Sequence, residues 1–413
     1  MSHLTAWIDL ATGEERREPT DPALVDAYLG GRGLAAAILA RRQPRGERVR
    51  GDELDRPGTP LIFSAGPLTG TGWPASARLH VTFHSPLTGI YGYANSGGFF
   101  GPALARAGYD ALVITGRAPD PVYLEVTPEG IALRPAAHLW GQGVYATHEA
   151  LAAGGGRVAC IGPAGENGVR IAAVMNDRER AAARCGGGAV MGRKNLKAVV
   201  VRGEVKRALP PAFRETARQA MAQVRDHPNV AGLRDWGTVG LVAIKNQTGD
   251  LPAHNHQRGQ VPWAGRVDAR AVAGYTLKNK GCYACPIRCG RVTEVVEGPE
   301  YETLDALGPM CGVSDLQAIL EANRLCNDLG LDTISTGVVI AFAMECHQHG
   351  LLDDGELSLE WGDRATLLGL VQAIARRQGL GEILADGVRR AAQAIGGDAP
   401  RYATHVTRLA LPR

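Results

Sequence analysis

The chain has 413 residues, in which 45 lysines and arginines nearly balance 42 aspartates and glutamates, for a formal net charge of +3. The two signs are mixed along the sequence and form no basic stripe of the kind that nucleic-acid binders carry, so we exclude DNA and RNA as partners. The longest apolar run, residues 338–344, is far shorter than the ~20 residues that a membrane-spanning helix needs, which excludes a membrane protein.

The length predicts two or three domains, each able to bury an apolar core. The first residues lack the basic region and long apolar segment of a secretory signal. The chain has 8 cysteines, and without such a signal these favour metal or redox chemistry over a disulfide framework. We therefore expect a cytoplasmic protein.

Residues 1–207 have the pattern of short strands separated by turns. Runs rich in β-branched and aromatic residues are bounded by Gly, Pro and Asn, which is typical of strands. These runs are residues 61–64, 79–83, 111–114, 122–126 and 198–201. They predict a mainly antiparallel β domain with long, glycine-rich loops.

The pattern changes near residue 207, where apolar residues begin to recur at helical spacing. The spacing predicts helices at residues 213–224, 316–329, 336–349, 365–377 and 383–395. We therefore place a domain boundary here, with a β-rich domain at 1–207 and a mainly helical domain at 208–413. The fold class that this predicts is α+β.

A cysteine loop in the helical half is the strongest chemical signal. Cys282, Cys285 and Cys289 have the spacing C-x2-C-x3-C, which fits three ligands of an iron-sulfur cluster. A zinc site is the alternative, because His254, His256 or Cys311 could complete a tetrahedral set of ligands. The cysteines at 160, 311, 326 and 346 sit in apolar runs, where we expect small core residues.

Two stretches combine glycines with arginines, residues 91–101 preceded by Arg78, and residues 176–188. Glycines let backbone amides approach an anion, and arginine can bind a phosphate through two hydrogen bonds. The two stretches together favour binding of a bulky phosphorylated cofactor. The alternative is that they form tight turns between strands. Neither stretch has the Rossmann or Walker pattern, so nicotinamide and nucleoside triphosphates are not expected.

Acidic residues follow the cysteine loop at 298–303 and recur at 327–332. A carboxylate there could act as a general base or bind a polar cofactor edge. The alternative is a helix-capping role, which is common for carboxylates that precede helices.

Taken together, these motifs resemble those of the aldehyde ferredoxin oxidoreductase family of tungsten-pterin enzymes. The resemblance runs in order along nearly the whole chain. It rests on residues 66–70 (GPLTG), 85–89 (SPLTG), 94–98 (ANSGG), 162–167 (GPAGEN), 188–192 (GAVMG), 282–289 (CYACPIRC), 298–302 (GPEYE) and 330–335 (GLDTIS).

The resemblance implies an N-terminal domain of two antiparallel sheets, which forms a base for two molybdopterins holding one tungsten, or molybdenum, atom. It also implies a [4Fe-4S] cluster on Cys282, Cys285 and Cys289, and it allows a Mg²⁺ that bridges the pterin phosphates. The pterin contacts that it implies are Arg78, Asn95, Gly97, Arg180, Ala181 and Ala183 from the first domain, and Asn327, Leu331 and Asp332 from the second.

The activity implied by the resemblance is oxidation of an aldehyde with water to a carboxylic acid, with electrons leaving through the cluster to ferredoxin. Glu302 matches the catalytic carboxylate of the family and would accept a proton from the attacking water. Arg324 stands where some members place a histidine of an iron site between subunits, so we expect no mononuclear iron. The resemblance is compatible with a homodimer.

The chain ends at Leu411-Pro412-Arg413, where the resemblance leads us to expect the third domain of the family to begin. We therefore predict that this third domain, with the fourth cluster cysteine, is absent. A separate C-terminal subunit would then supply it. The alternative is an inactive fragment, or a cofactor-binding protein without turnover.

Overall fold

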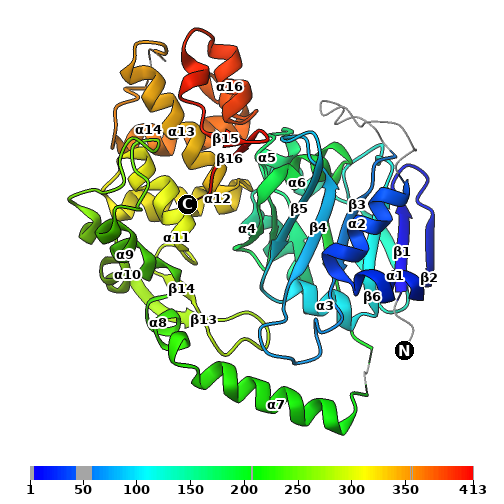
Figure 1. Cartoon of the computed structure of the whole chain (residues 1–413). Coiled ribbons are helices and arrows are strands. Elements are labelled where there is room, and N and C mark those ends of the chain that lie inside the picture. The colour runs from blue at the N-terminus through cyan, green and yellow to red at the C-terminus, as the bar shows by residue number, and fades with distance from the viewer. Residues whose placement is uncertain (1–3, 43–57, 206–207, 354, 356, 413) are drawn as a thin grey trace. The chain divides into compact units, whose positions relative to one another are not determined.

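The structure, a computed structural model, describes residues 4–42, 58–205, 208–353, 355 and 357–412. It divides into two compact units (Figure 1). The first comprises Met1–Arg225 with Cys282–Pro286, and the second comprises Asp226–Gly281 with Ile287–Arg413. Cys282 and Cys285 therefore belong to the first unit and Cys289 to the second. Residues 206–207, where we predicted the boundary, lie outside the described residues.

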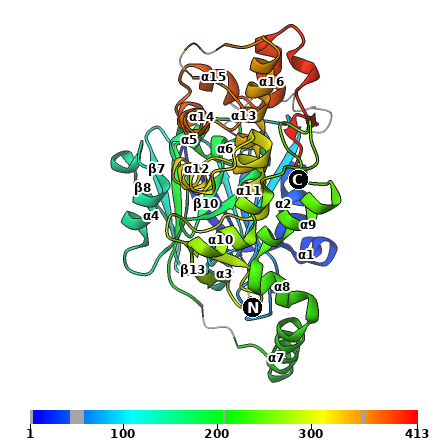
Figure 2. The ribbon, with the colours of Figure 1, turned by 90° about the vertical axis from the view of Figure 1, so that its left-hand side faces the viewer.

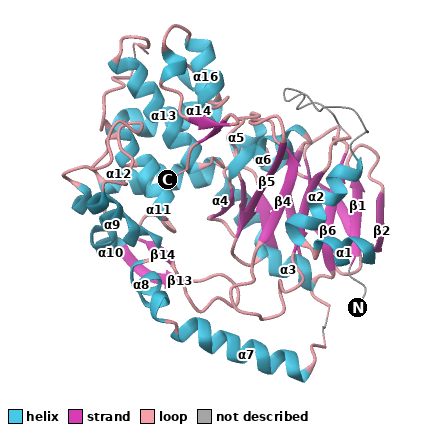
Figure 3. Ribbon diagram, viewed as in Figure 1, coloured by secondary structure: helices cyan, strands magenta, loops and turns pink. Residues whose placement is uncertain are grey.

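The first unit is built on two six-stranded sheets (Figure 3). The first sheet has the order β2-β1-β6-β3-β4-β5 and the second has the order β11-β10-β9-β12-β7-β8. The strands are β1 (Leu4–Asp9), β2 (Glu15–Pro19), β3 (Leu61–Ala65), β4 (Leu79–His84), β5 (Tyr91–Ser96), β6 (Tyr109–Thr115), β7 (Val122–Val126), β8 (Ile131–Pro135), β9 (Arg157–Cys160), β10 (Val174–Asn176), β11 (Arg180–Ala182) and β12 (Leu196–Val201).

Most neighbouring strands run antiparallel, as the sequence predicts, and each sheet contains one parallel pair. The parallel pairs are β1 with β6 and β12 with β7. Local residue patterns specify a strand but not its partner, so these pairs were not predictable from the sequence.

The two sheets share one apolar core. Phe63 and Phe83 of the first sheet pack in the same buried cluster as Leu124 and Val199 of the second. Because side chains alternate along a strand, Ile62 points the other way and packs beneath α2 (Gly31–Arg42). In the same manner α4 (Val144–Ala152) covers the outer face of the second sheet. Both sheets thus lie between helices and a common core, which holds their edges and loops in place.

Several short helices and one 16-residue helix complete the first unit. They are α1 (Pro22–Tyr28), α3 (Phe100–Arg106), η1 (Ala137–Leu139), α5 (Pro163–Glu166), η2 (Arg184–Gly186), α6 (Gly187–Arg193) and α7 (Pro211–Asp226), whose last residue falls in the second unit.

The second unit is mainly helical. Its helices are α8 (Pro228–Trp236), η3 (Thr238–Gly240), α9 (Leu241–Thr248), η4 (Ala264–Arg266), α10 (Ala269–Tyr275), α11 (Tyr301–Leu307), η5 (Pro309–Cys311), α12 (Leu316–Leu329), α13 (Thr333–Gln348), α14 (Arg364–Arg376), α15 (Leu380–Leu384), α16 (Val388–Ile395) and η6 (Ala399–Arg401). Two hairpins accompany them, β13 (Thr276–Lys280) with β14 (Gly290–Thr293), and β15 (His405–Val406) with β16 (Leu409–Ala410).

The central helix α13 is buried along most of its length and lies beside α12 and α14 (Figure 2). The α+β fold class is therefore confirmed, and four of the five helices are found close to their predicted bounds. The predicted helix at 383–395 is instead two helices, α15 and α16. They separate at Gly387, whose φ of +85° lies outside the helical range.

The described part of the chain holds no helix that is long and apolar enough to cross a membrane. The cysteines at 160, 311, 326 and 346 are all buried, which confirms them as core residues. Burial, together with the Asp332 carboxylate, raises the pKa of the Cys326 thiol well above its usual range.

A buried lysine makes the stability of the protein depend on pH. Burial lowers the pKa of Lys194 from 10.5 to about 8 in the folded chain. Between these values the unfolded chain binds more protons, so the free energy of unfolding should rise as the pH increases from about 8 to 10.5. Urea denaturation across this range should show the rise, and Lys194→Met should lose that component of it. Lys245→Met, at a partly exposed lysine, should keep it, and equal slopes in both variants would contradict this explanation.

Candidate active site

One face of the first sheet gathers arginine, tyrosine and asparagine side chains. In β5 the residues alternate between exposed and buried, which places Tyr91, Tyr93 and Asn95 together on the exposed face. Arg78 Nη1 donates a hydrogen bond to Asn95 Oδ1 at 3.0 Å. The guanidinium of Arg32 lies 4.6 Å from the centre of the Tyr93 ring. We call Arg32, Arg78, Tyr91, Tyr93 and Asn95 the β5 face.

The β5 face concentrates positive charge. Burial is the main cause of the lowered pKa of His80, and the nearby charges of Arg32 and Arg78 lower it further. Two guanidinium groups suit phosphates, and exposed tyrosine rings suit a flat heterocycle. The structure thus brings together the predicted residues Arg78 and Asn95. The sequence reasoning missed Arg32 and Tyr93, although Tyr at alternate positions of an exposed strand was a usable signal.

The turn after β5 is held by two neighbouring polar side chains. Asn176 Nδ2 donates to the carbonyl of Gly97 at 3.0 Å. One carboxylate oxygen of Asp177 accepts from the backbone N–H groups of Phe99 at 2.5 Å and of Phe100 at 3.1 Å. This carboxylate therefore binds the first N–H groups of α3 and fixes the turn. The sequence motifs did not predict this role for Asn176 and Asp177.

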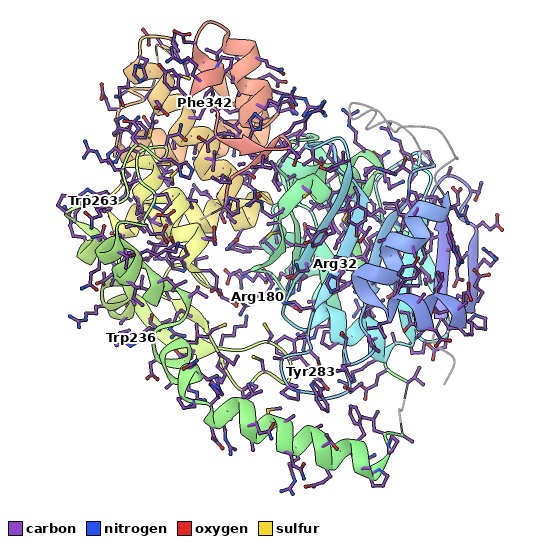
Figure 4. All side chains as sticks on the ribbon, viewed as in Figure 1. Arg32, Arg180, Trp236, Trp263, Tyr283 and Phe342 are labelled. Atoms are coloured by element: carbon purple, nitrogen blue, oxygen red, sulfur yellow. The ribbon has the colours of Figure 1, made fainter. Side chains whose placement is uncertain are left out.

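The predicted residues of β11 lie against the same turn. A side chain at Gly98, whose φ is +95°, would collide with the Asp177 carboxylate and lie 3.3 Å from Cγ of Arg180. Arg180 and Ala181 pair with Asn176 and Met175 of β10. Arg180 is labelled with Arg32 in Figure 4. Gly98 and Arg180 are thus neighbours.

Ala183 begins a strained turn beyond β11. Cys185 in this turn has a φ of +72°, which is unusual for a residue with a side chain. Its carbonyl accepts a hydrogen bond from Ser85 Oγ at 2.8 Å, so the turn is tied to the loop after β4. Ala183 and Ala181 are half-buried, and their proposed contacts with pterin remain predictions.

The first part of the cysteine loop packs on the turn after β5. A Cβ atom added at Gly97 would lie 2.5 Å from Cys282 Sγ, so the absence of a side chain there makes room for this sulfur. Tyr283 N donates to the Gly98 carbonyl at 3.1 Å, and Cys285 N donates to the Cys282 carbonyl at 3.1 Å. The ring of Tyr283, labelled in Figure 4, meets Phe99 edge to face.

The cysteines suit an iron-sulfur cluster by their chemistry. Cys282, Cys285 and Cys289 are half-buried, and the space at Gly97 is one that a larger side chain would fill. Cys311, one candidate for a zinc ligand, is buried, with its sulfur directed at the carbonyls of Ala306 and Gly337. Among the described residues, no three His, Cys, Asp or Glu side chains are gathered as a metal site.

Adding a methyl group at position 97 should displace Cys282. Gly97→Ala is expected to reduce the iron bound per chain severalfold, because the new Cβ would overlap the sulfur. Gly232→Ala is the matched control, since a Cβ there meets nothing within 4 Å and alanine favours the helix. Iron analysis of both purified variants tests this prediction. Equal iron in Gly97→Ala and the native chain would contradict it.

In the second unit, Glu302 lies in the first turn of α11 and is half-buried. The next residue, Thr303, makes a hydrogen bond of 2.7 Å with Thr333 at the start of α13. The carboxylate of Asp332 accepts from Ile334 N at 3.1 Å and from Ser335 Oγ at 2.5 Å. The structure thus brings the Glu302 end of α11 to Asp332, and it shows Asp332 in the capping role that we kept as an alternative.

Leu331 and Asn327 are both buried in the second unit. Leu331 N donates to the carbonyl of Cys326 at 2.8 Å, which ends α12 together with Gly330. Asn327 lies in the last turn of α12. Their predicted contacts with a pterin remain untested.

Two family models match the chain. The aldehyde ferredoxin oxidoreductase N-terminal domain matches residues 5–203, and aldehyde ferredoxin oxidoreductase domains 2 and 3 match residues 215–413. The second match shows that our prediction of an absent third domain is wrong. That prediction rested on where the chain ends relative to the family motifs, whereas the model of domains 2 and 3 matches residues 215–413. The separate C-terminal subunit, which we inferred from that absence, is therefore not supported.

The relatives agree with the family models. The chain is 43% identical to the tungsten-containing aldehyde ferredoxin oxidoreductase of Pyrococcus furiosus over 98% of its own length and 69% of that protein. It is 30% identical to the aliphatic sulfonate oxidoreductase, WOR-like subunit, of the same organism, with the same coverage.

A solved structure has the same fold. It is the active site complex BamBC of benzoyl coenzyme A reductase with 1,5-dienoyl-CoA, with a TM-score of 0.88 and 30% identity. The alignment covers 99% of this chain and 65% of that chain. Both halves of the chain match models of one family, and the relatives and the solved structure agree with them. The chain therefore belongs to the aldehyde ferredoxin oxidoreductase family.

Proposed function

We propose that the chain oxidises an aldehyde with water to the carboxylic acid at a tungsten bis-pterin centre. The two electrons leave through a [4Fe-4S] cluster to ferredoxin, and two protons are released. One observation carries the proposal. Asn95 of the β5 face and Gly97, which makes room for Cys282, are separated by one residue in the first unit. Residues suited to pterin and to the cluster therefore lie next to each other at the end of β5.

The residues of the β5 face would bind and orient the cofactor. Arg78, held by Asn95, and Arg32, held over Tyr93, would neutralise phosphate groups. Arg180, Ala181 and Ala183 would add contacts from β11 and the turn after it, as would Asn327, Leu331 and Asp332 from the second unit. We include a Mg²⁺ ion at the pterin phosphates in this proposal.

The chemistry needs a proton acceptor from the protein. When bound, the metal centre supplies a Lewis acid and an acceptor for two electrons. Glu302 would take a proton from the water that adds to the aldehyde carbonyl. The first turn of α11 places its carboxylate at a helix N-terminus, where negative charge is stabilised. This position suits the proposed role of Glu302 as the proton acceptor.

The choice of an aldehyde rests on similarity. The chain is 43% identical to an aldehyde oxidoreductase and 30% identical to an aliphatic sulfonate oxidoreductase. Ferredoxin as the acceptor follows from the name of the tungsten-containing aldehyde ferredoxin oxidoreductase, and Cys282, Cys285 and Cys289 would hold the cluster.

Metal analysis tests the proposed centre. The protein should be purified without oxygen from cells supplied with tungstate, and assayed for tungsten, pterin, iron, sulfide and zinc. We expect about one tungsten and about four iron atoms per chain, with broad visible absorbance from the cluster. Zinc in place of iron, without this absorbance, would instead support the zinc alternative.

A further inference from the structure

Arg291, two residues after Cys289, is a buried cation. It lies in β14, and only 5% of its surface is exposed. Its Nη1 donates to the carbonyls of Arg288 at 3.4 Å, Cys289 at 3.2 Å and Gly290 at 3.2 Å. Three successive carbonyls of the cysteine loop thus point at one guanidinium. Such an arrangement fixes the backbone that carries the Cys289 sulfur.

The same guanidinium ties the loop to α8. Arg291 Nη2 donates to the carbonyl of Arg234 at 2.9 Å. Gly237, at the end of α8, has a φ of +66°, and a Cβ there would lie 2.6 Å from the Cys289 carbonyl oxygen. The Cys289 carbonyl is therefore held between Gly237 and the Arg291 side chain. Each of these contacts lies within the second unit.

The charge of Arg291 has no carboxylate in hydrogen-bonding contact. In the described part of the chain, all its hydrogen-bond acceptors are backbone carbonyls. The ionisable groups that act on it are Cys289, Glu300 and Asp235. Glu300 already accepts a hydrogen bond from Thr238 at 2.5 Å, and Asp235 is exposed. A buried cation that has only carbonyl groups as hydrogen-bond acceptors is stabilised by any further negative charge brought close to it.

We propose that Arg291 is a positioning residue for Cys289 whose fixed positive charge raises the reduction potential of the bound cluster. This inference rests on the proposed function. A cluster held by thiolates is anionic and gains another negative charge on reduction, so a buried cation nearby stabilises the reduced form more than the oxidised form. The anionic cluster would in turn stabilise the buried guanidinium of Arg291.

Three variants of the holoprotein test the inference by redox titration, monitored by the electron paramagnetic resonance of the reduced cluster. Arg291→Gln removes the charge, and Arg291→Lys keeps the charge but loses the planar fork. Arg288→Gln is the matched control, because it removes an exposed cation adjacent to Cys289. Iron content and melting temperature are measured alongside.

Arg291→Gln should make reduction of the cluster roughly tenfold less favourable, a shift of about 59 mV to lower potential. Arg291→Lys should change the equilibrium constant for cluster reduction less than about threefold. It should, however, alter the line shape of the electron paramagnetic resonance spectrum. Arg288→Gln should change the equilibrium less than about threefold, because solvent screens an exposed charge.

An unshifted potential in Arg291→Gln, or an equal shift in Arg288→Gln, would contradict the inference. If Arg291→Gln does not fold, Arg291→Lys tests the inference. A tenfold change in the equilibrium constant for cluster reduction in Arg291→Lys would show that the charge is not the cause. A native protein without iron and sulfide would overturn the proposed function as well. A native protein with its cluster and an unshifted Arg291→Gln would overturn this inference alone.

Discussion

Replacing Cys282 with alanine should abolish the iron-sulfur cluster. The sulfur of Cys282 occupies the space left by Gly97, and its loop is fixed by the hydrogen bond from Tyr283 to the Gly98 carbonyl. A cluster that loses one of three local thiolates lacks the anionic ligand needed at that iron. We expect nearly complete loss of iron, sulfide and visible absorbance. Electron transfer to ferredoxin should fall to background with them.

Cys160→Ala is the control for this prediction. Cys160 is 1% exposed and lies in the core beneath α4. Its removal should cost about 1 kcal/mol of stability by leaving a small cavity, without loss of iron. Native iron content in Cys282→Ala, or equal losses of iron in both variants, would show that Cys282 is not a ligand.

Replacing Glu302 with glutamine should lower kcat by about 10²- to 10⁴-fold. Glutamine has nearly the same shape and cannot accept the proton from water. Tungsten and iron contents should stay at native levels, because the substitution leaves the β5 face and the cysteine loop unchanged. Steady-state kinetics with an aldehyde, together with metal analysis, measures the effect.

Glu300→Gln is the matched control for Glu302. Glu300 precedes α11 and accepts a hydrogen bond from Thr238 Oγ1, which a glutamine oxygen can still accept. We expect kcat within a fewfold of the native value. A Glu302→Gln variant with native metal content and native kcat would remove Glu302 from the mechanism. An equal loss in Glu300→Gln would point to a structural effect on the start of α11.

Local patterns in the sequence were enough to predict most of the helices and strands of the fold. The helix at 316–329 has its predicted bounds, because Asp315 caps its start and Gly330 ends it in a left-handed conformation. The division between α15 and α16 was missed, since an apolar helical spacing continues across Gly387. The parallel pairs in the two sheets depend on residues far apart in the chain, which no local pattern encodes.

The candidate site was only partly visible in the sequence. Arg78 and Asn95 could be assigned because the family resemblance covers them, and the structure joins them by a hydrogen bond. Arg32 comes from a helix far earlier in the chain, so only the tertiary fold brings it to Tyr93. Arg291 stands close to a cysteine ligand, but arginine is seldom buried and its sequence gives no sign of this burial.

The central claim is that this chain couples aldehyde oxidation to ferredoxin reduction. The most direct measurement is the stoichiometry of ferredoxin reduced per aldehyde consumed by the tungsten-loaded protein in the absence of oxygen. The claim predicts two electrons delivered for each aldehyde converted to its carboxylic acid. Protein with full tungsten, pterin and iron that neither consumes aldehyde nor reduces ferredoxin would contradict it.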